Sequence, residues 1–140
     1  MRRFLPASLA VVLIALAAPA AAQEEAPPPA ADVEVTQAVV ATGVQDREPV
    51  GADSTFTADV GTLYFYTVFE GDFGSMPVEH VWLHEGEEIA RVPLTVEGPR
   101  WRTWSSKEIL PAWTGAWTVQ VVDADGMEHA AVDFTVTEGM

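Results

Sequence analysis

Apolar and polar residues alternate with a period of two through most of the chain after residue 32, and Gly, Pro and Asp interrupt the alternation at short intervals. This pattern is typical of short β-strands joined by turns, because successive side chains of a strand point to opposite faces of the sheet. The same region shows no sustained helical period. The pattern therefore predicts an all-β domain over residues 32–138.

The alternation predicts seven strands, over residues 33–40, 62–70, 78–84, 89–96, 101–107, 117–123 and 129–136. Residues 45–54 are predicted as a loop, residues 71–77 as a turn and residues 111–115 as a loop, because they are polar or rich in Gly and Pro. Strands of this number and length, joined mostly by short turns, predict a small immunoglobulin-like antiparallel β-sandwich. Trp82 lies in the middle of the third strand, where such folds often place a core tryptophan.

The first 22 residues have the three-part pattern of a secretory signal peptide. Arg2 and Arg3 precede an unbroken apolar stretch from Leu9 to Ala18, and Ala20-Ala21-Ala22 offers a cleavage site before Gln23. An uncleaved membrane anchor is the alternative, but the apolar core is shorter than the roughly 20 residues of a spanning helix. We therefore expect an exported protein, periplasmic or extracellular, with no transmembrane segment after cleavage.

Residues 23–31 read QEEAPPPAA, which is acidic, rich in proline and poor in large apolar residues. This composition predicts a linker rather than part of a packed domain. The expected organisation is a signal peptide over 1–22, a Pro/Ala/Glu-rich linker over 23–31 and the β-sandwich over 32–138.

The charge of the chain argues against one large class of partners. The formal net charge is −14, and loss of Arg2 and Arg3 with the signal peptide would lower it to −16. A surface this acidic repels the phosphates of nucleic acids. The chain also has no Cys, so disulfides cannot stabilise the domain and the core must do so.

Several stretches of the chain resemble a bacterial family known as domain of unknown function 2914. They read LYFYTVFEG, HVWLHEGEEIARVPLTV, RWRTWSSKEILPAWTGAWTVQVVDADG and FTV, from about Gly61 to the C-terminus. The W-R-T-W-S-S-K run followed by W-T-G-x-W carries most of the specificity. The resemblance implies a small β domain of exported or envelope proteins, and it implies no known activity.

Basic residues cluster in one part of the sequence, since Arg91, Arg100, Arg102 and Lys107 fall close together. If the strands over 89–96 and 101–107 pair as a hairpin, Arg91, Arg102 and Trp104 share its outer face and Lys107 lies at the strand end. Such a surface can stack on a sugar ring or bind a carboxylate through a guanidinium fork. The candidate ligand-binding residues are therefore Arg91, Arg102, Trp104 and Lys107, and the candidate ligands are a glycan, an acidic peptide or an envelope protein.

Two structural explanations of the same residues stay open. Trp104 can be the core residue and Trp101 the exposed one, because residues three apart on a strand point to opposite faces. The arginines can also simply pair with nearby carboxylates on the surface.

No residue pattern indicates a metal, a cofactor or a catalytic centre. His80 and His84 lie about 13 Å apart on a strand, too far to share one metal ion. The run from Asp123 to Gly126, with Glu128, is better explained as a hairpin turn than as a calcium loop. The chain has no Cys nucleophile, no G-x-S-x-G motif and no phosphate-binding glycine loop.

The sequence favours a non-catalytic binding or interaction module. One alternative is an assembly subunit whose exposed edge strand, Val33 to Val40, is completed by another chain. The other is a hydrolase with a site assembled across strands. That alternative predicts a cleft in which His80, His84 or His129 lies within hydrogen-bond distance of Ser105, Ser106 or a carboxylate.

Overall fold

The structure is a computed structural model that describes residues 32–139, and these residues contain ten strands and no helix. The predicted signal peptide and linker, residues 1–31, lie outside the described residues. Within the described part, no helix is long and apolar enough to cross a membrane. The strands, in chain order, are β1 (Asp32–Ala41), β2 (Gly43–Gln45), β3 (Glu48–Val50), β4 (Thr55–Thr57), β5 (Thr62–Asp72), β6 (Ser75–His84), β7 (Glu87–Glu97), β8 (Arg100–Glu108), β9 (Gly115–Asp123) and β10 (Glu128–Thr137).

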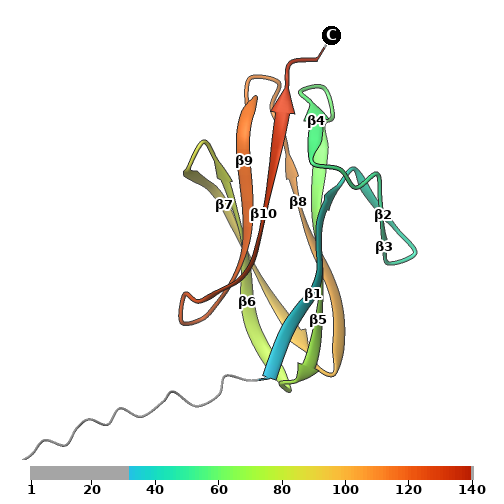
Figure 1. The fold of residues 1–140 in the computed structure, drawn as a ribbon, viewed down its shortest axis with the longest axis vertical. Helices are drawn as coiled ribbons and strands as arrows, with labels where there is room; N and C mark the ends of the chain where they lie inside the picture. The colour runs from blue at the N-terminus through green and yellow to red at the C-terminus, as the bar shows by residue number, and fades with distance from the viewer. Residues whose placement is uncertain (1–31, 140) are drawn as a thin grey trace, which may run out of the picture.

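Two sheets face each other and confirm the predicted sandwich (Figure 1). One sheet has the order β1-β5-β8 and the other has the order β4-β10-β9-β6-β7. Neighbouring strands are antiparallel except β4 and β10, which are parallel. A separate hairpin of β2 and β3 projects to one side of the three-stranded sheet (Figure 1).

Large aromatic side chains fill the space between the sheets. Trp82 is fully buried, as the sequence predicted, and its ring meets Phe65 and Phe134 edge to face. Trp117 stacks on the same Phe134 at a centroid distance of 5.7 Å. Buried aromatic pairs of this kind stabilise a core through both their area and their geometry. Both tryptophans and Phe134 belong to the five-stranded sheet, so among these aromatic pairs the one between Trp82 and Phe65 of β5 links the two layers.

The structure has ten strands rather than seven because three short strands lie where the sequence predicted a loop or made no prediction. The β2–β3 hairpin occupies residues 43–50, and its two turn residues, Asp46 and Arg47, have φ angles of 52° and 64°. Two successive positive φ values are the conformation of a tight hairpin turn, for which Asn and Gly are the usual residues. Neither turn residue is Gly, so the hairpin has a weak sequence signal.

The predicted hairpin between residues 89–96 and 101–107 is wrong. β7 pairs with β6 in the five-stranded sheet, whereas β8 pairs with β5 in the three-stranded sheet. The chain crosses between the layers at Gly98 and Pro99. A Cβ at Gly98 would lie 2.5 Å from the carbonyl oxygen of Gly71, so this crossing needs a residue without a side chain.

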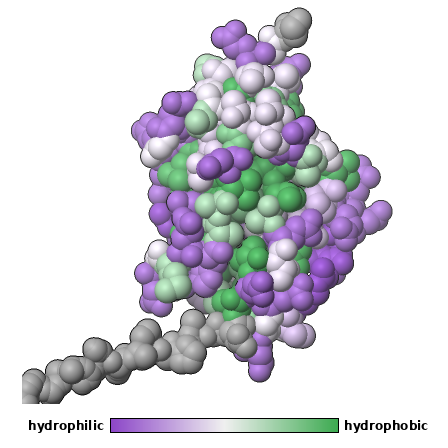
Figure 2. Space-filling model, viewed as in Figure 1, coloured by the Kyte–Doolittle hydropathy of each residue, from purple (hydrophilic) through white to green (hydrophobic). Residues whose placement is uncertain are grey.

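β1 and β10 lie beside each other along one side of the sandwich. Figure 2 shows apolar side chains reaching the surface along the middle of this face, between more hydrophilic flanks. Half-buried apolar residues of these two strands pack against the core there: Val33, Val35, Ala130 and Val132.

Candidate functional site

Basic and aromatic side chains gather around one hollow at the three-stranded sheet. It has a volume of about 530 Å³ and is lined by Arg47, Arg100, Trp101, Arg102 and Trp104. We call it the arginine–tryptophan hollow. Three of its five lining residues are cations, in a chain with a formal net charge of −14.

β8 supplies four of these residues because it is an edge strand of its sheet. Trp104 lies opposite Tyr66 of β5 on the outer face, and Arg102 and Arg100 share that face because they alternate with the inward Ser105. Trp101 lies opposite Phe69 on the inner side, yet its place at the free edge exposes it. Trp101 and Trp104 are each 36% exposed, so both tryptophans reach solvent.

The β2–β3 hairpin brings Arg47 to the hollow from a distant part of the sequence. The Tyr66 hydroxyl donates to the Arg47 carbonyl oxygen at 2.6 Å, and Arg102 Nη1 donates to the same oxygen at 3.4 Å. The Trp104 ring stacks on Tyr66 with a centroid distance of 6.0 Å and an interplanar angle of 15°. These contacts bury Tyr66 on the outer face and fix one side of the hollow.

Burial raises the pKa of Tyr66, and the Glu48 carboxylate adds to this effect, while Arg102 and Arg100 oppose it. The phenol therefore keeps its proton at neutral pH and remains the donor that holds the hairpin.

The arginines of the hollow form only long ion pairs. Arg102 lies 3.5 Å from Glu48 and Arg100 lies 3.6 Å from Glu70, and all four side chains are at least 30% exposed. Exposed pairs of this kind contribute about 0–1 kcal/mol. The ion pairs found among the described residues do not include Arg47. The hollow thus keeps one more cation than carboxylate, and its guanidinium groups stay accessible to an anion.

The structure separates the four ligand-binding residues that the sequence proposed. Arg102 and Trp104 lie together in the hollow, but Arg91 lies on β7 of the other sheet. Arg91 donates to Glu79 at 2.6 Å and to Glu88 at 2.9 Å, and its hydrogen bonds to Glu88 and Glu79 raise its pKa. For Arg91, the structure therefore supports the alternative in which a surface arginine simply pairs with nearby carboxylates.

Lys107 is also outside the hollow. Its Nζ lies 5.2 Å from the centroid of the Trp113 ring, which is a cation–π contact. Sequence reasoning missed Arg47, Arg100 and Trp101 as members of the site. Arg100 and Trp101 lie in the basic cluster that was noticed, but nothing in the sequence links Arg47 to it.

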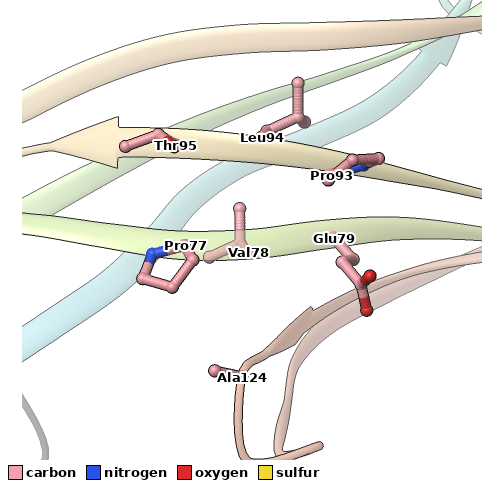
Figure 3. Close-up of a pocket in the computed structure, with 7 residues that line it drawn as sticks. All are labelled: Pro77, Val78, Glu79, Pro93, Leu94, Thr95 and Ala124. Atoms are coloured by element: carbon pink, nitrogen blue, oxygen red, sulfur yellow. The ribbon is translucent and has the colours of Figure 1, made fainter.

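A second hollow of about 410 Å³ lies on β6 and β7 beside the β9–β10 turn (Figure 3). Its lining residues are Pro77, Val78, Glu79, Pro93, Leu94, Thr95 and Ala124. Glu79 is its one charged residue, and its carboxylate already binds Arg91. This hollow therefore offers little to orient a polar ligand.

A serine and a histidine meet inside the core. His80 Nδ1 lies 2.7 Å from Ser105 Oγ, and His80 Nε2 lies 3.1 Å from Thr67 Oγ1. Burial lowers the pKa of His80 to about 3, so the ring is neutral at ordinary pH. His80 is 0% exposed and Ser105 is 6% exposed, so the pair lies in the core and not in a cleft.

The other two histidines have separate structural partners. His84 Nε2 donates to the Thr114 carbonyl at 2.7 Å, and His129 Nε2 lies 2.9 Å from Asp123 Oδ2. Asp123 Oδ1 also accepts the backbone N–H groups of Asp125 and Met127, which fixes the β9–β10 turn. The hydrogen bond from His129 is the main reason that the pKa of Asp123 is lowered.

Asp123 therefore fixes a hairpin turn at the place where the sequence predicted one. Among residues 32–139, no group of three or more His, Cys, Asp or Glu side chains is placed to hold a metal ion.

Residues 75–136 match the family model described as Protein of unknown function (DUF2914). The match confirms the resemblance seen in the sequence for this C-terminal part of the chain, whereas the stretch over residues 63–71 precedes the matched region. No curated protein matches the chain.

Two solved structures of β-glucosidases show a distant likeness in fold. The enzyme from Kluyveromyces marxianus gives a TM-score of 0.45 at 10% identity over 76% of this chain and 14% of that chain. The enzyme from Listeria innocua, in complex with glucose, gives a TM-score of 0.42 at 9% identity over 76% of this chain and 16% of that chain. The chain thus spans a small part of either enzyme, and likeness at this level carries no argument about its function.

Proposed function

We propose that this chain, whose residues 75–136 match a family of unknown function, is an exported, non-catalytic binding module. Its ligand occupies the arginine–tryptophan hollow. The observation that carries the proposal is the gathering of Arg47, Arg100 and Arg102 with two exposed tryptophans around one hollow, in a strongly acidic protein.

The chemistry of the hollow favours a ligand with a carboxylate next to a flat apolar face. A guanidinium group can bind a carboxylate through two parallel hydrogen bonds. A tryptophan ring can stack on the face of a sugar or a proline. An acidic glycan unit and an acidic peptide both combine these two features.

The charge of the whole protein favours ligands of low charge. The overall field of the acidic chain repels a polyanion at long range. The hollow attracts an anion only at short range, where Glu48 and Glu70 already offset two of the three arginines. A ligand with one or two carboxylates therefore fits better than a highly charged polymer.

Export is a separate part of the proposal, and it rests on the pattern of residues 1–22. N-terminal sequencing of the protein recovered from the extracytoplasmic fraction tests it. A mature N-terminus at Gln23 is expected, and an intact N-terminus in the cytoplasm would contradict it.

The strand edges give less support to an assembly subunit. β1 is an edge strand, as predicted, but its pairing with β5 is interrupted by a bulge between Val35 and Gln37. The edge strand β7 carries Pro93, which has no N–H to donate. Bulges and prolines are devices that discourage pairing with another chain.

A hydrolase site is also less well supported. His80 and Ser105 come together as that alternative requires, but both are buried and the second partner of His80 is Thr67 rather than a carboxylate. A substrate would have to open the core to reach this serine.

The test of binding uses digalacturonate, its neutral galactose counterpart and a short glutamate-containing peptide as probes. The indole N–H resonances of Trp101 and Trp104 are followed by NMR during titration. We expect an anionic probe to shift them and the neutral sugar to bind more weakly.

Matched variants decide whether the hollow is responsible. Arg102→Gln is expected to weaken binding about tenfold, as loss of one charged contact of about 1.4 kcal/mol would. Arg91→Gln removes the same charge from the other sheet and is expected to leave binding unchanged. Equal effects of the two variants, or no response to either anionic probe, would overturn the proposal.

A further inference from the structure

The chain carries its own candidate ligand, because residues 23–31 (QEEAPPPAA) combine carboxylates with a run of prolines. We propose that this segment competes for the arginine–tryptophan hollow of the same molecule, with a glutamate beside the arginines and a proline on a tryptophan. The inference rests on the proposed function and adds a form of regulation to it, since an external ligand must displace the segment.

The pairing of the strands places the hollow within reach of this segment. Glu34 of β1 lies opposite Glu70 of β5, and Glu70 lies opposite Arg100 of β8. Two strand spacings separate β1 from β8, so Glu34, two residues after the start of the domain, is about 10 Å from Arg100. Trp104 lies four residues further along β8, about 13 Å away.

The length of the segment covers these distances. Prolines favour an extended polyproline conformation with a rise of about 3.1 Å per residue, so residues 23–31 can span about 28 Å. Glu24 and Glu25 can therefore reach Arg102, and Pro27 can reach Trp101 at the near end of β8.

The chemistry of the segment matches that of the hollow. Proline-rich peptides bind aromatic-lined grooves, because their extended backbone is already ordered and their rings pack on aromatic faces. The hollow has one cation more than its neighbouring carboxylates, so it can take one glutamate rather than a longer acidic run.

A tether also compensates for weak contacts. A short linker gives an effective concentration in the millimolar range, so a contact with a dissociation constant of about 1 mM is substantially occupied within one molecule. A free ligand at lower concentration would then need a higher affinity to displace the segment.

The absence of Cys from the chain allows a direct test. A nitroxide is attached to Ala26→Cys in the chain as purified from cells, and line broadening of the tryptophan indole resonances is compared with that of the reduced label. We expect strong broadening at Trp101 and Trp104. Trp113 serves as an internal reference, because it follows the far end of β8.

Charge variants separate docking from chance encounters of a tethered label. Glu24→Gln with Glu25→Gln is expected to reduce the broadening about twofold or more, because it removes the electrostatic attraction that the tether amplifies. The control Glu87→Gln with Glu138→Gln changes the same charge at exposed positions and should leave the broadening unchanged. Raising the salt from about 0.02 M to about 0.5 M should also reduce the broadening, because salt screens the attraction between the glutamates and the arginines.

Two results would overturn the inference. Broadening that is insensitive to Glu24 and Glu25 would mean that the segment only passes near the hollow. Broadening of isotope-labelled molecules by spin-labelled neighbours in a mixed sample would place the segment on another copy. Neither result affects the proposed function, which depends on the response of Trp101 and Trp104 to digalacturonate or the acidic peptide.

Discussion

The imidazole of His80 and the hydroxyl of Ser105 join the two layers of the sandwich, with Nδ1 and Oγ 2.7 Å apart. The contacts of both residues form one directed chain. Trp82 Nε1 donates to Ser105 Oγ, the Ser105 hydroxyl donates to His80 Nδ1, His80 Nε2 donates to Thr67 Oγ1, and Thr67 donates to the Thr103 carbonyl. Every polar group in this chain has a partner only when His80 is neutral, with its proton on Nε2.

The neutral state of His80 makes the stability of the domain depend on pH. The pKa of His80 is about 3 in the folded domain and 6.5 in the unfolded chain. Above pH 6.5 both states are neutral, and below it only the unfolded chain gains the proton. The free energy of unfolding should therefore fall by up to about 1.4 kcal/mol per pH unit between pH 6.5 and 3.

Urea unfolding of the wild-type protein and of His80→Gln between about pH 7 and about pH 4 measures this contribution. Titration of the carboxylates affects the stability of both proteins equally. The difference between them in the slope of unfolding free energy against pH is therefore due to His80. Parallel curves for the two proteins would contradict the prediction.

Ser105→Ala should destabilise the domain because it leaves Trp82 Nε1 and His80 Nδ1 without their shared partner. Leaving buried polar groups unsatisfied costs about 1–3 kcal/mol. Ser106→Ala is the matched control, since Ser106 is the exposed neighbour and should cost less than about 0.5 kcal/mol. Equal midpoints of denaturant unfolding for the two variants would show that the network contributes nothing.

Trp104→Phe should remove a tryptophan signal that iodide quenches, at a cost below about 1.5 kcal/mol, because Trp104 is one-third exposed. Trp101→Phe should behave alike, since its exposure is the same. Trp82→Phe is the control at a buried position. It should lower the free energy of unfolding by more than Trp104→Phe does, and it should leave the iodide-quenchable signal unchanged. A large loss of stability in Trp104→Phe would instead make Trp104 a structural residue.

Tyr66→Phe should loosen the β2–β3 hairpin, because it removes the hydrogen bond to the Arg47 carbonyl. The global stability should fall by about 0.5–1.5 kcal/mol. Hydrogen exchange of the hairpin amides should speed up more than that of the amides in β9. Unchanged exchange in residues 43–50 would mean that other contacts hold Arg47 at the hollow.

The positions of most strands could be predicted because alternation reports which residues face the core. Trp117, Val119 and Val121 alternate into the interior, and Trp82 is buried as predicted. The short strands β2, β3 and β4 carry only three residues each, too few for a period of two to show. The turn residues Asp46 and Arg47 add no glycine that would have marked the hairpin.

The candidate site was only half predictable for a related reason. Alternation places Arg102 and Trp104 on one face of a strand, and both line the hollow. It does not say which strand lies alongside, so Arg91 was grouped with them by an assumed hairpin that the chain does not form. Arg47 joins them through hydrogen bonds that span 19 and 55 residues of sequence.

The sequence by itself determined the all-β class, the core tryptophan and the concentration of basic residues near β8. These follow from local properties, namely side-chain alternation and composition. Only the tertiary structure decided that β7 and β8 lie in different sheets, that Ser105 meets His80, and that Arg47 completes the hollow. Those outcomes depend on which strands pair, and pairing is selected by the burial of whole faces rather than by any short stretch of residues.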